Sequence, residues 1–66
     1  MDYSWLRFWD YVDDGKVDVV AGRYGKYIVL KVCKERIVEQ CVTVHLTHDD
    51  LKRLIEKLQT VHEVIE

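Results

Sequence analysis

Proline is absent from this 66-residue sequence, which also has only three glycines and two cysteines. Its 48% hydrophobic content and lack of low-complexity runs exclude a disordered or linker class. Two cysteines are too few for a disulfide scaffold, so we expect Cys33 and Cys41 to be buried or half-buried thiols. No apolar run approaches the roughly 20 residues of a membrane span, and we expect no signal peptide. The sequence therefore predicts a single cytoplasmic domain over residues 1–66.

Charge is unevenly distributed along the chain, although the net charge is only −2. Residues 1–15 carry a net charge of −3, residues 16–36 carry +4, and residues 37–66 carry −3. A basic centre between acidic ends can orient a charged partner. The chain lacks the overall basic excess that is typical of nucleic-acid-binding proteins.

The clearest local pattern is a strand that runs directly into a helix. Residues 42–46 alternate between apolar and polar, which is the period of a strand with one buried face. Thr47 is a favourable N-cap, and Asp50 stands at the third position of a capping box. The apolar residues that follow have the spacing of a helix with one buried stripe. They are Leu51, Leu54, Ile55 and Leu58. We predict a helix that begins after Thr47 and continues through Val61 toward Ile65.

The aromatic residues near the N-terminus fit two structures. Four apolar residues have the spacing of one helical side, and they are Trp5, Phe8, Trp9 and Val12. A strand from Ser4 to Val12 would instead have a less uniformly apolar face, made of Trp5, Arg7, Trp9 and Tyr11. We predict the short helix, with its aromatic side chains in the core because so small a chain needs them there.

Between the two predicted helices, alternation predicts strands over residues 17–21 and 26–34 and a third strand ending at Leu46. Their inner face comprises Val17, Val19, Ala21, Ile28, Leu30, Val32, Val42, Val44 and Leu46. The predicted fold class is α+β, a small α-β-β-β-α domain whose antiparallel three-stranded meander has both helices packed on one face. The pairing of the last two strands stays open. A three-residue turn sets Lys31 opposite Glu39, whereas a longer turn sets Leu30 opposite Val44.

The α-β-β-β-α order and the length resemble the double-stranded RNA-binding domain. That family places a Lys-Lys-x-x-Lys cluster at the start of its last helix to contact phosphates, where this chain has His48-Asp49-Asp50-Leu51-Lys52. The resemblance covers topology and not chemistry. Separately, Gly22-Arg23-Tyr24-Gly25-Lys26-Tyr27 resembles the Gly-Arg-Tyr-Gly-Pro-Tyr run in C-terminal single-strand-binding modules of bacterial type IA topoisomerases. Neither resemblance assigns the chain to a family.

The sequence contains no convincing pattern for catalysis or metal binding. Cys41 and His45 share a strand face but lie roughly 13 Å apart at about 3.3 Å per residue, and there is no Cys-x-x-Cys pair. His45 and His48, with Asp49, offer only a weak site. A Gly-rich phosphate loop and a His-Glu-x-x-His motif are also absent. We expect no enzymatic activity, no cofactor and no metal.

The outer face of the predicted sheet is too apolar for a simply solvated surface. It comprises Val20, Tyr27, Val29, Lys31, Cys33, Cys41, Thr43 and His45. An apolar patch ringed by charge usually marks an interface. We therefore predict a non-enzymatic protein-binding or regulatory module, an acidic homodimer associating through this face or a sheet edge. Viruses and mobile elements often encode small inhibitors that occlude a partner's surface, and by analogy we predict that this chain is an inhibitor-type protein. If a virus encodes the chain, it would act in the host cytoplasm.

The predicted partner is another protein, and no membrane is expected to take part. A nucleic-acid-handling partner would suit the acidic helix face formed by Asp49, Asp50, Glu56 and Glu63. The alternative function is a nucleic-acid-binding module that stacks bases on the basic meander. Its residues would be Arg23, Tyr24, Lys26, Tyr27, Lys31, Lys34 and Arg36. The two aspartates at the helix start disfavour phosphate there, so nucleic acid is the less favoured partner.

Overall fold

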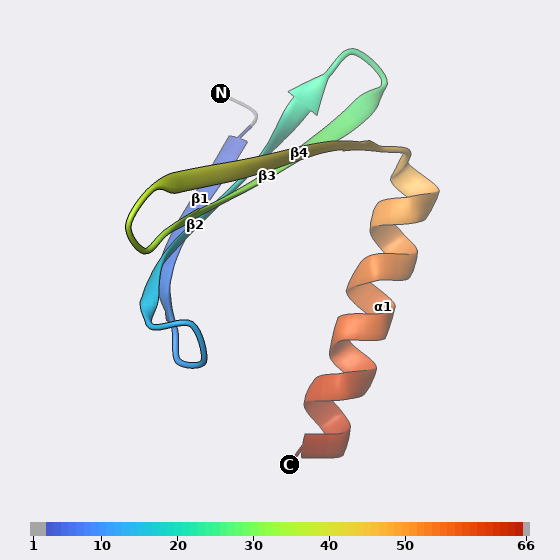
Figure 1. The fold of residues 1–66 in the computed structure, drawn as a ribbon. Helices are drawn as coiled ribbons and strands as arrows, with labels where there is room; N and C mark the ends of the chain where they lie inside the picture. Colours follow the sequence, from blue (N-terminus) through green and yellow to red (C-terminus); the bar gives the residue numbers. More distant parts are fainter. Residues whose placement is uncertain (1–2, 66) are drawn as a thin grey trace.

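The chain folds as a four-stranded antiparallel meander followed by one helix (Figure 1). The computed structural model describes residues 3–65, with side chains to residue 64. The elements are β1 (Tyr3–Asp10), β2 (Gly15–Tyr24), β3 (Tyr27–Glu35), β4 (Glu39–Leu46) and α1 (His48–Ile65). The strands lie in the order β1-β2-β3-β4, so each strand pairs with its neighbour in the sequence. The α+β class is confirmed, whereas the α-β-β-β-α order is wrong.

The N-terminal aromatic segment is a strand and not a helix. β1 pairs with β2 along its whole length, from Tyr3 opposite Gly22 to Asp10 opposite Gly15. The helical spacing of its aromatic residues is also compatible with a strand, and aromatic side chains favour strands when a partner is available. Because a strand and not a helix precedes β2, the topological resemblance to the double-stranded RNA-binding domain also fails.

The turn between β1 and β2 explains why the chain reverses at that point. The Asp10 carboxylate accepts hydrogen bonds from the backbone N–H groups of Val12, at 3.0 Å, and Asp13, at 3.1 Å. Asp14 has a φ of 58°, a left-handed conformation that aspartate tolerates better than most residues. Its N–H donates to the Asp10 carbonyl at 2.8 Å. These bonds close the hairpin that aligns β1 with β2.

The other two turns fix the remaining registers. Gly25 has a φ of 60° and follows Tyr24, which pairs with Tyr27, so glycine stands first in a two-residue hairpin turn where a positive φ is required. On the other side of the sheet, Leu30 pairs with Val44, as the longer-turn alternative predicted. β3 and β4 nevertheless extend further than expected, and only residues 36–38 form the turn.

The sheet has one predominantly apolar face, which we call the inner face. Cross-strand partners point to the same side of a sheet, so the register defines this face directly. Its apolar residues are Leu6, Phe8, Val17, Val19, Ala21, Ile28, Leu30, Val32, Val42, Val44 and Leu46. All nine residues predicted for it are on it, joined by Leu6 and Phe8 from β1. Among the described residues, Val17 and Ile28 are the only buried hydrophobic side chains, so the chain has almost no core of its own.

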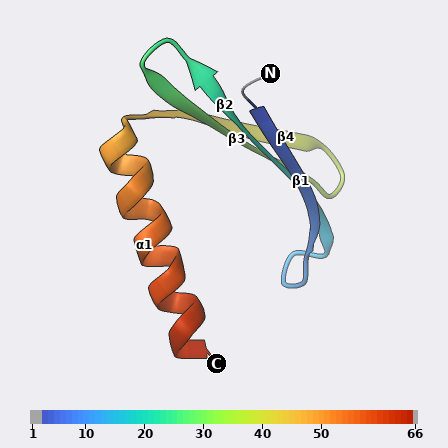
Figure 2. The same cartoon turned by 180° about the vertical axis from the view of Figure 1, so that it is seen from behind.

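The helix begins as predicted, but it does not cover the sheet. The Asp50 N–H donates to Thr47 Oγ1 at 3.1 Å, and the Leu51 N–H donates to the Thr47 carbonyl at 3.0 Å. α1 contacts β3 and β4 and then projects away from the sheet (Figures 1 and 2). Leu54, Leu58 and Val61 remain 38–60% exposed. The expectation that helices pack along one sheet face is therefore wrong.

Candidate protein-binding face

The second face of the sheet, which we call the outer face, gathers all eight residues predicted for the protein interface. Four cross-strand rows build most of it, and each row takes one residue from every strand. The rows are Tyr3-Gly22-Val29-His45, Trp5-Val20-Lys31-Thr43, Arg7-Asp18-Cys33-Cys41 and Trp9-Lys16-Glu35-Glu39. Tyr24 and Tyr27 form a further cross-strand pair beside the first row. The predicted interface residues therefore lie on one continuous surface.

β1 adds the largest aromatic groups of this face. Tyr3, Trp5 and Trp9 are 58%, 56% and 43% exposed, although large apolar rings usually find cover in a folded protein. The predicted helix would have placed both tryptophans in the core, so their contribution to this face was not predicted from the sequence. The strand alternative carried the signal, because it placed Trp5, Arg7 and Trp9 together.

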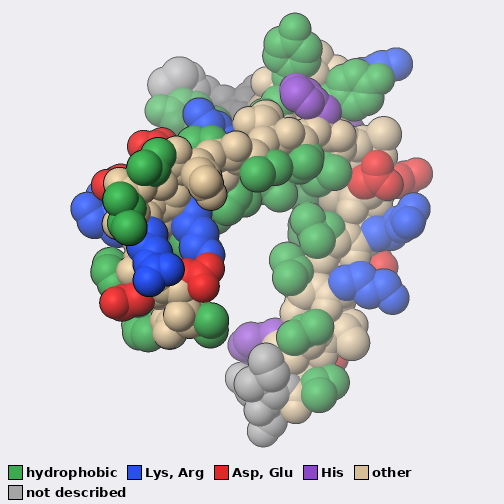
Figure 3. Space-filling view, viewed as in Figure 1, with side chains coloured by type: hydrophobic (Ala, Val, Ile, Leu, Met, Phe, Trp, Pro, Cys, Tyr) green, Lys and Arg blue, Asp and Glu red, His purple; other side chains and the backbone are tan. Residues whose placement is uncertain are grey.

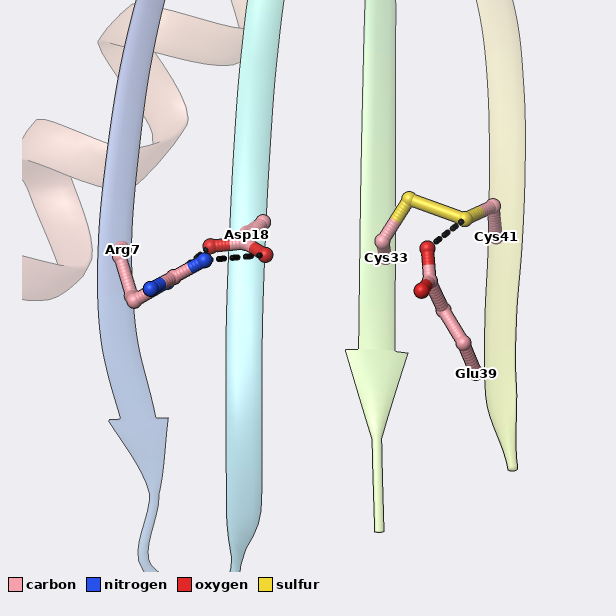
Figure 4. The surroundings of a disulfide bond; sticks show 5 residues. All are labelled: Arg7, Asp18, Cys33, Glu39 and Cys41. Atoms are coloured by element: carbon pink, nitrogen blue, oxygen red, sulfur yellow. Dashed lines mark hydrogen bonds and ion pairs between the residues drawn. A yellow bond between two sulfur atoms is a disulfide. The ribbon is translucent and has the colours of Figure 1, made fainter. Parts of the chain in front are cut away.

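Charge on the outer face is balanced locally. Arg7 Nε donates to Asp18 Oδ1 at 2.7 Å, and Arg7 Nη2 donates to Asp18 Oδ2 at 3.4 Å (Figure 4). The Arg7 guanidinium lowers the pKa of the Asp18 carboxyl, first through this hydrogen bond. Arg7 Cζ also lies 5.2 Å from the centre of a Trp5 ring, a cation–π contact that holds this ring beside the ion pair.

Smaller aromatic contacts order the end of the face near the β2–β3 turn. Lys26 Nζ lies 5.5 Å from the centre of the Tyr27 ring. The rings of Tyr24 and His45 meet edge to face, with their centres 5.9 Å apart. Such pairs favour fixed ring orientations. The face therefore presents aromatic side chains that are exposed and already partly oriented.

Cys33 and Cys41 form a disulfide across β3 and β4, so the expectation of free thiols is wrong (Figure 4). The register places the two residues directly opposite each other. The predicted alternative that sets Leu30 opposite Val44 also sets Cys33 opposite Cys41, so the disulfide could have been predicted from that register. Glu39 Oε1 lies 3.4 Å from Cys41 Sγ, and the three side chains could together approach a metal ion. A disulfide lacks the thiolate charge that binds metals, so this oxidised cluster is not a metal site.

The basic and tyrosine residues of the nucleic-acid alternative do not gather on one surface. Lys31, Tyr24 and Tyr27 belong to the outer face, whereas Arg23 and Lys34 occupy inner-face register positions. Lys26 lies in the β2–β3 turn, and Arg36 lies in the turn at the opposite end of the sheet.

Lys34 is engaged within the chain. Its ammonium lies 3.1 Å from Asp10 Oδ2, and it also pairs with Asp13. These carboxylates raise the pKa of Lys34, with the Asp13 hydrogen bond the largest cause. A phosphate would have to compete with them for this side chain.

The acidic residues of α1 divide into two groups. Asp49, Glu56 and Glu63 are spaced seven residues apart, so they share the side of the helix opposite its apolar stripe. Asp50 lies away from them, where its carboxylate is 3.8 Å from Arg53 Nη1. Asp49 and Asp50 stand in the first turn, which favours negative charge. Three of the four residues predicted for the acidic face therefore share one side of the helix, and Asp50 does not.

Comparison of the chain with protein-family models, with curated proteins and with solved structures found no match. Within residues 3–65, α1 is too polar to serve as a membrane-spanning helix.

Proposed function

We propose that the chain is a non-enzymatic protein-binding module that regulates a partner protein by covering part of its surface. The observation that supports this most strongly is the exposure of Trp5 and Trp9 on an outer face whose charges are balanced. Tryptophan, tyrosine and arginine are the residues most enriched in the energetic centres of protein interfaces. Tyr3, Tyr27 and Arg7 lie on the same sheet face as the two tryptophans.

The rigidity of the face also favours protein binding. A sheet holds its side chains in fixed rows, so little conformational entropy is lost when a partner docks. Arg7 is held by Asp18 and contacts Trp5 before any partner arrives. A partner would therefore meet a preformed surface with aromatic groups and a local ion pair.

Affinity capture with paired variants tests this proposal. The full chain is used to capture partners from its source cell, with and without nuclease, and is compared with a Trp5→Ala/Trp9→Ala double variant. Losing a central aromatic residue of an interface costs at least about 2 kcal/mol, or roughly 30-fold in affinity. We expect the double variant to lose a protein that the wild-type chain captures in the presence of nuclease.

Tyr11→Ala is the matched control, because Tyr11 is an aromatic residue that lies in the β1–β2 turn and is 90% exposed. It should capture the same protein as the wild-type chain. Circular dichroism of both variants checks that the fold is retained. If a folded double variant captures the partner as well as wild type does, the outer face is not the binding surface.

Single-strand nucleic-acid binding is the second candidate function, and exposed aromatic rings next to Arg7 are the observation that favours it. Bases can stack on such rings without sequence preference. This function predicts binding to labelled single strands that weakens steeply with salt. It also predicts that nuclease removes whatever the wild-type chain captures. The balanced charge of the outer face makes it the weaker candidate.

A further inference from the structure

Two apolar surfaces of the chain border one hollow, and each lacks a cover (Figure 3). One is the inner face, where Leu6, Phe8 and Val42 are 61%, 47% and 66% exposed. The other is the apolar stripe of α1, which comprises Leu51, Leu54, Ile55, Leu58 and Val61. The space-filling view shows hydrophobic side chains on the side of α1 that borders the hollow, with charged groups on its other side. The chain thus exposes the two halves of a helix-on-sheet core.

The total exposed area shows how much cover is missing. The chain has an accessible surface of 5936 Å². A compact monomer of 7.9 kDa is expected to expose about 4,400 Å², so the excess is about 1,500 Å². This excess fits a chain whose hydrophobic side chains are almost all exposed or half-buried.

The connection between β4 and α1 explains why the helix leaves its own sheet. Thr47 is the only residue between the last residue of β4 and the first residue of α1. Both its hydroxyl and its carbonyl accept hydrogen bonds from the first turn of the helix. So short a capped connection fixes the direction in which α1 departs. In the first turn of α1, Leu51 lines a shallow depression with Ala21 and Ile28 of the inner face.

We propose that a second copy of this chain fills the hollow, in a two-fold symmetric dimer in which the α1 stripe of each copy packs on the inner face of the other. A two-fold axis covers both apolar surfaces of both chains in one closed assembly, so neither apolar surface is left to bind a third copy. This inference goes beyond the proposed function, because it concerns the inner face and α1. The two outer faces stay open to partners.

The area and the charge distribution both suit this occupant. Burying about 1,500 Å² on each chain gives about 3,000 Å² in total, within the range of obligate homodimers. The two central rows of the inner face, Leu6-Val19-Val32-Val42 and Ser4-Ala21-Leu30-Val44, contain no charged residue. The helical stripe contains none either. The dimer therefore buries no unpaired charge at its centre.

Sedimentation equilibrium of the full chain is the first test. We expect twice the 7.9 kDa mass of one chain, and a melting temperature that rises with protein concentration, because association stabilises the folded state by mass action. We expect Leu58→Glu to abolish the dimer or the fold. Thr60→Glu is the matched control, since Thr60 lies on the opposite side of α1 and should keep the wild-type mass and melting temperature.

The monomeric alternative makes the opposite prediction, because Leu58 is 60% exposed in the single chain and should tolerate glutamate. Equal melting of the two glutamate variants, or a monomeric mass, overturns the proposal. Isotope-filtered NMR on a mixed labelled and unlabelled sample locates the interface. Contacts between Leu58 of one copy and Val42 or Phe8 of the other support the proposal, whereas contacts confined to β1 edges or outer faces overturn it.

Failure of this inference is distinguishable from failure of the proposed function. A monomer whose partner capture depends on Trp5 and Trp9 overturns the dimer and leaves outer-face binding intact. A dimer with the expected contacts, whose partner capture does not depend on these tryptophans, supports the dimer and overturns outer-face binding.

Discussion

Reducing the Cys33–Cys41 disulfide should destabilise the chain by an amount that the loop length predicts. The bond joins residues separated by eight positions, and loop-closure entropy for such a loop gives about 2.5 kcal/mol of stabilisation. That is a large share of the stability of a domain this small. Because β3 and β4 are already adjacent, opening the bond leaves the fold the same and acts through the unfolded chain.

Urea unfolding of oxidised and reduced protein, at one protein concentration, measures this difference. With a denaturant slope of about 1 kcal/mol per molar, typical of a small chain, the midpoint should fall by about 2.5 M on reduction. A Cys33→Ser/Cys41→Ser double variant serves as the control, because its midpoint should match that of the reduced chain and ignore the reductant. Mass spectrometry after alkylation confirms the thiol state of each sample.

Equal midpoints for verified oxidised and reduced chains would refute the loop-closure reasoning. Recovery of only free thiols after mild oxidation would contradict the pairing itself. The result also bears on location. Reducing compartments keep thiols reduced, so the predicted cytoplasmic chain would have to fold without this contribution.

Two further predictions concern the turns and caps that set the chain's direction. Thr47→Ala removes the hydroxyl that accepts the Asp50 N–H, and should lower the free energy of unfolding by about 1 kcal/mol in urea titrations; an unchanged value would mean that the cap is not formed. The pKa of Asp10 is lowered to about 2, first by the Asp13 N–H and then by the Lys34 ammonium and the Val12 N–H. A carboxyl with a lowered pKa stabilises the fold above the ordinary carboxyl pKa and loses that effect as pH falls toward 2. Stability measured from pH 5 to pH 2, near and below the ordinary carboxyl pKa of about 3.9, should therefore fall more steeply for wild type than for Asp10→Asn, and parallel curves would contradict the assignment.

Local patterns in the sequence were sufficient for much of the fold. The alternation of residues 17–21 and 42–46 identified the inner and outer faces, because side-chain direction in a strand has a period of two. The Thr47 cap identified the start of α1, because a hydroxyl that accepts the Asp50 N–H satisfies a donor that the helix leaves open. The eight interface residues share the outer face for the same reason, although their role in binding stays a prediction.

Two features depended on contacts between distant segments. The segment around Trp5 and Trp9 has a spacing that suits a helix and a strand alike, and only pairing with β2 selects the strand. The disulfide follows from the β3–β4 register, for which residues 31–44 allow two alternatives.

Local sequence was therefore sufficient for the periodicity of β2, β3, β4 and α1, for the start of the helix and for the residue types that these three strands place on each sheet face. Contacts in the folded chain were needed to show that β1 brings its tryptophans to the outer face and that α1 leaves the inner face uncovered. The physical reason is that periodicity and capping are set by neighbours within a few residues. Strand pairing and helix packing instead depend on hydrogen bonds and apolar contacts between segments far apart in the chain.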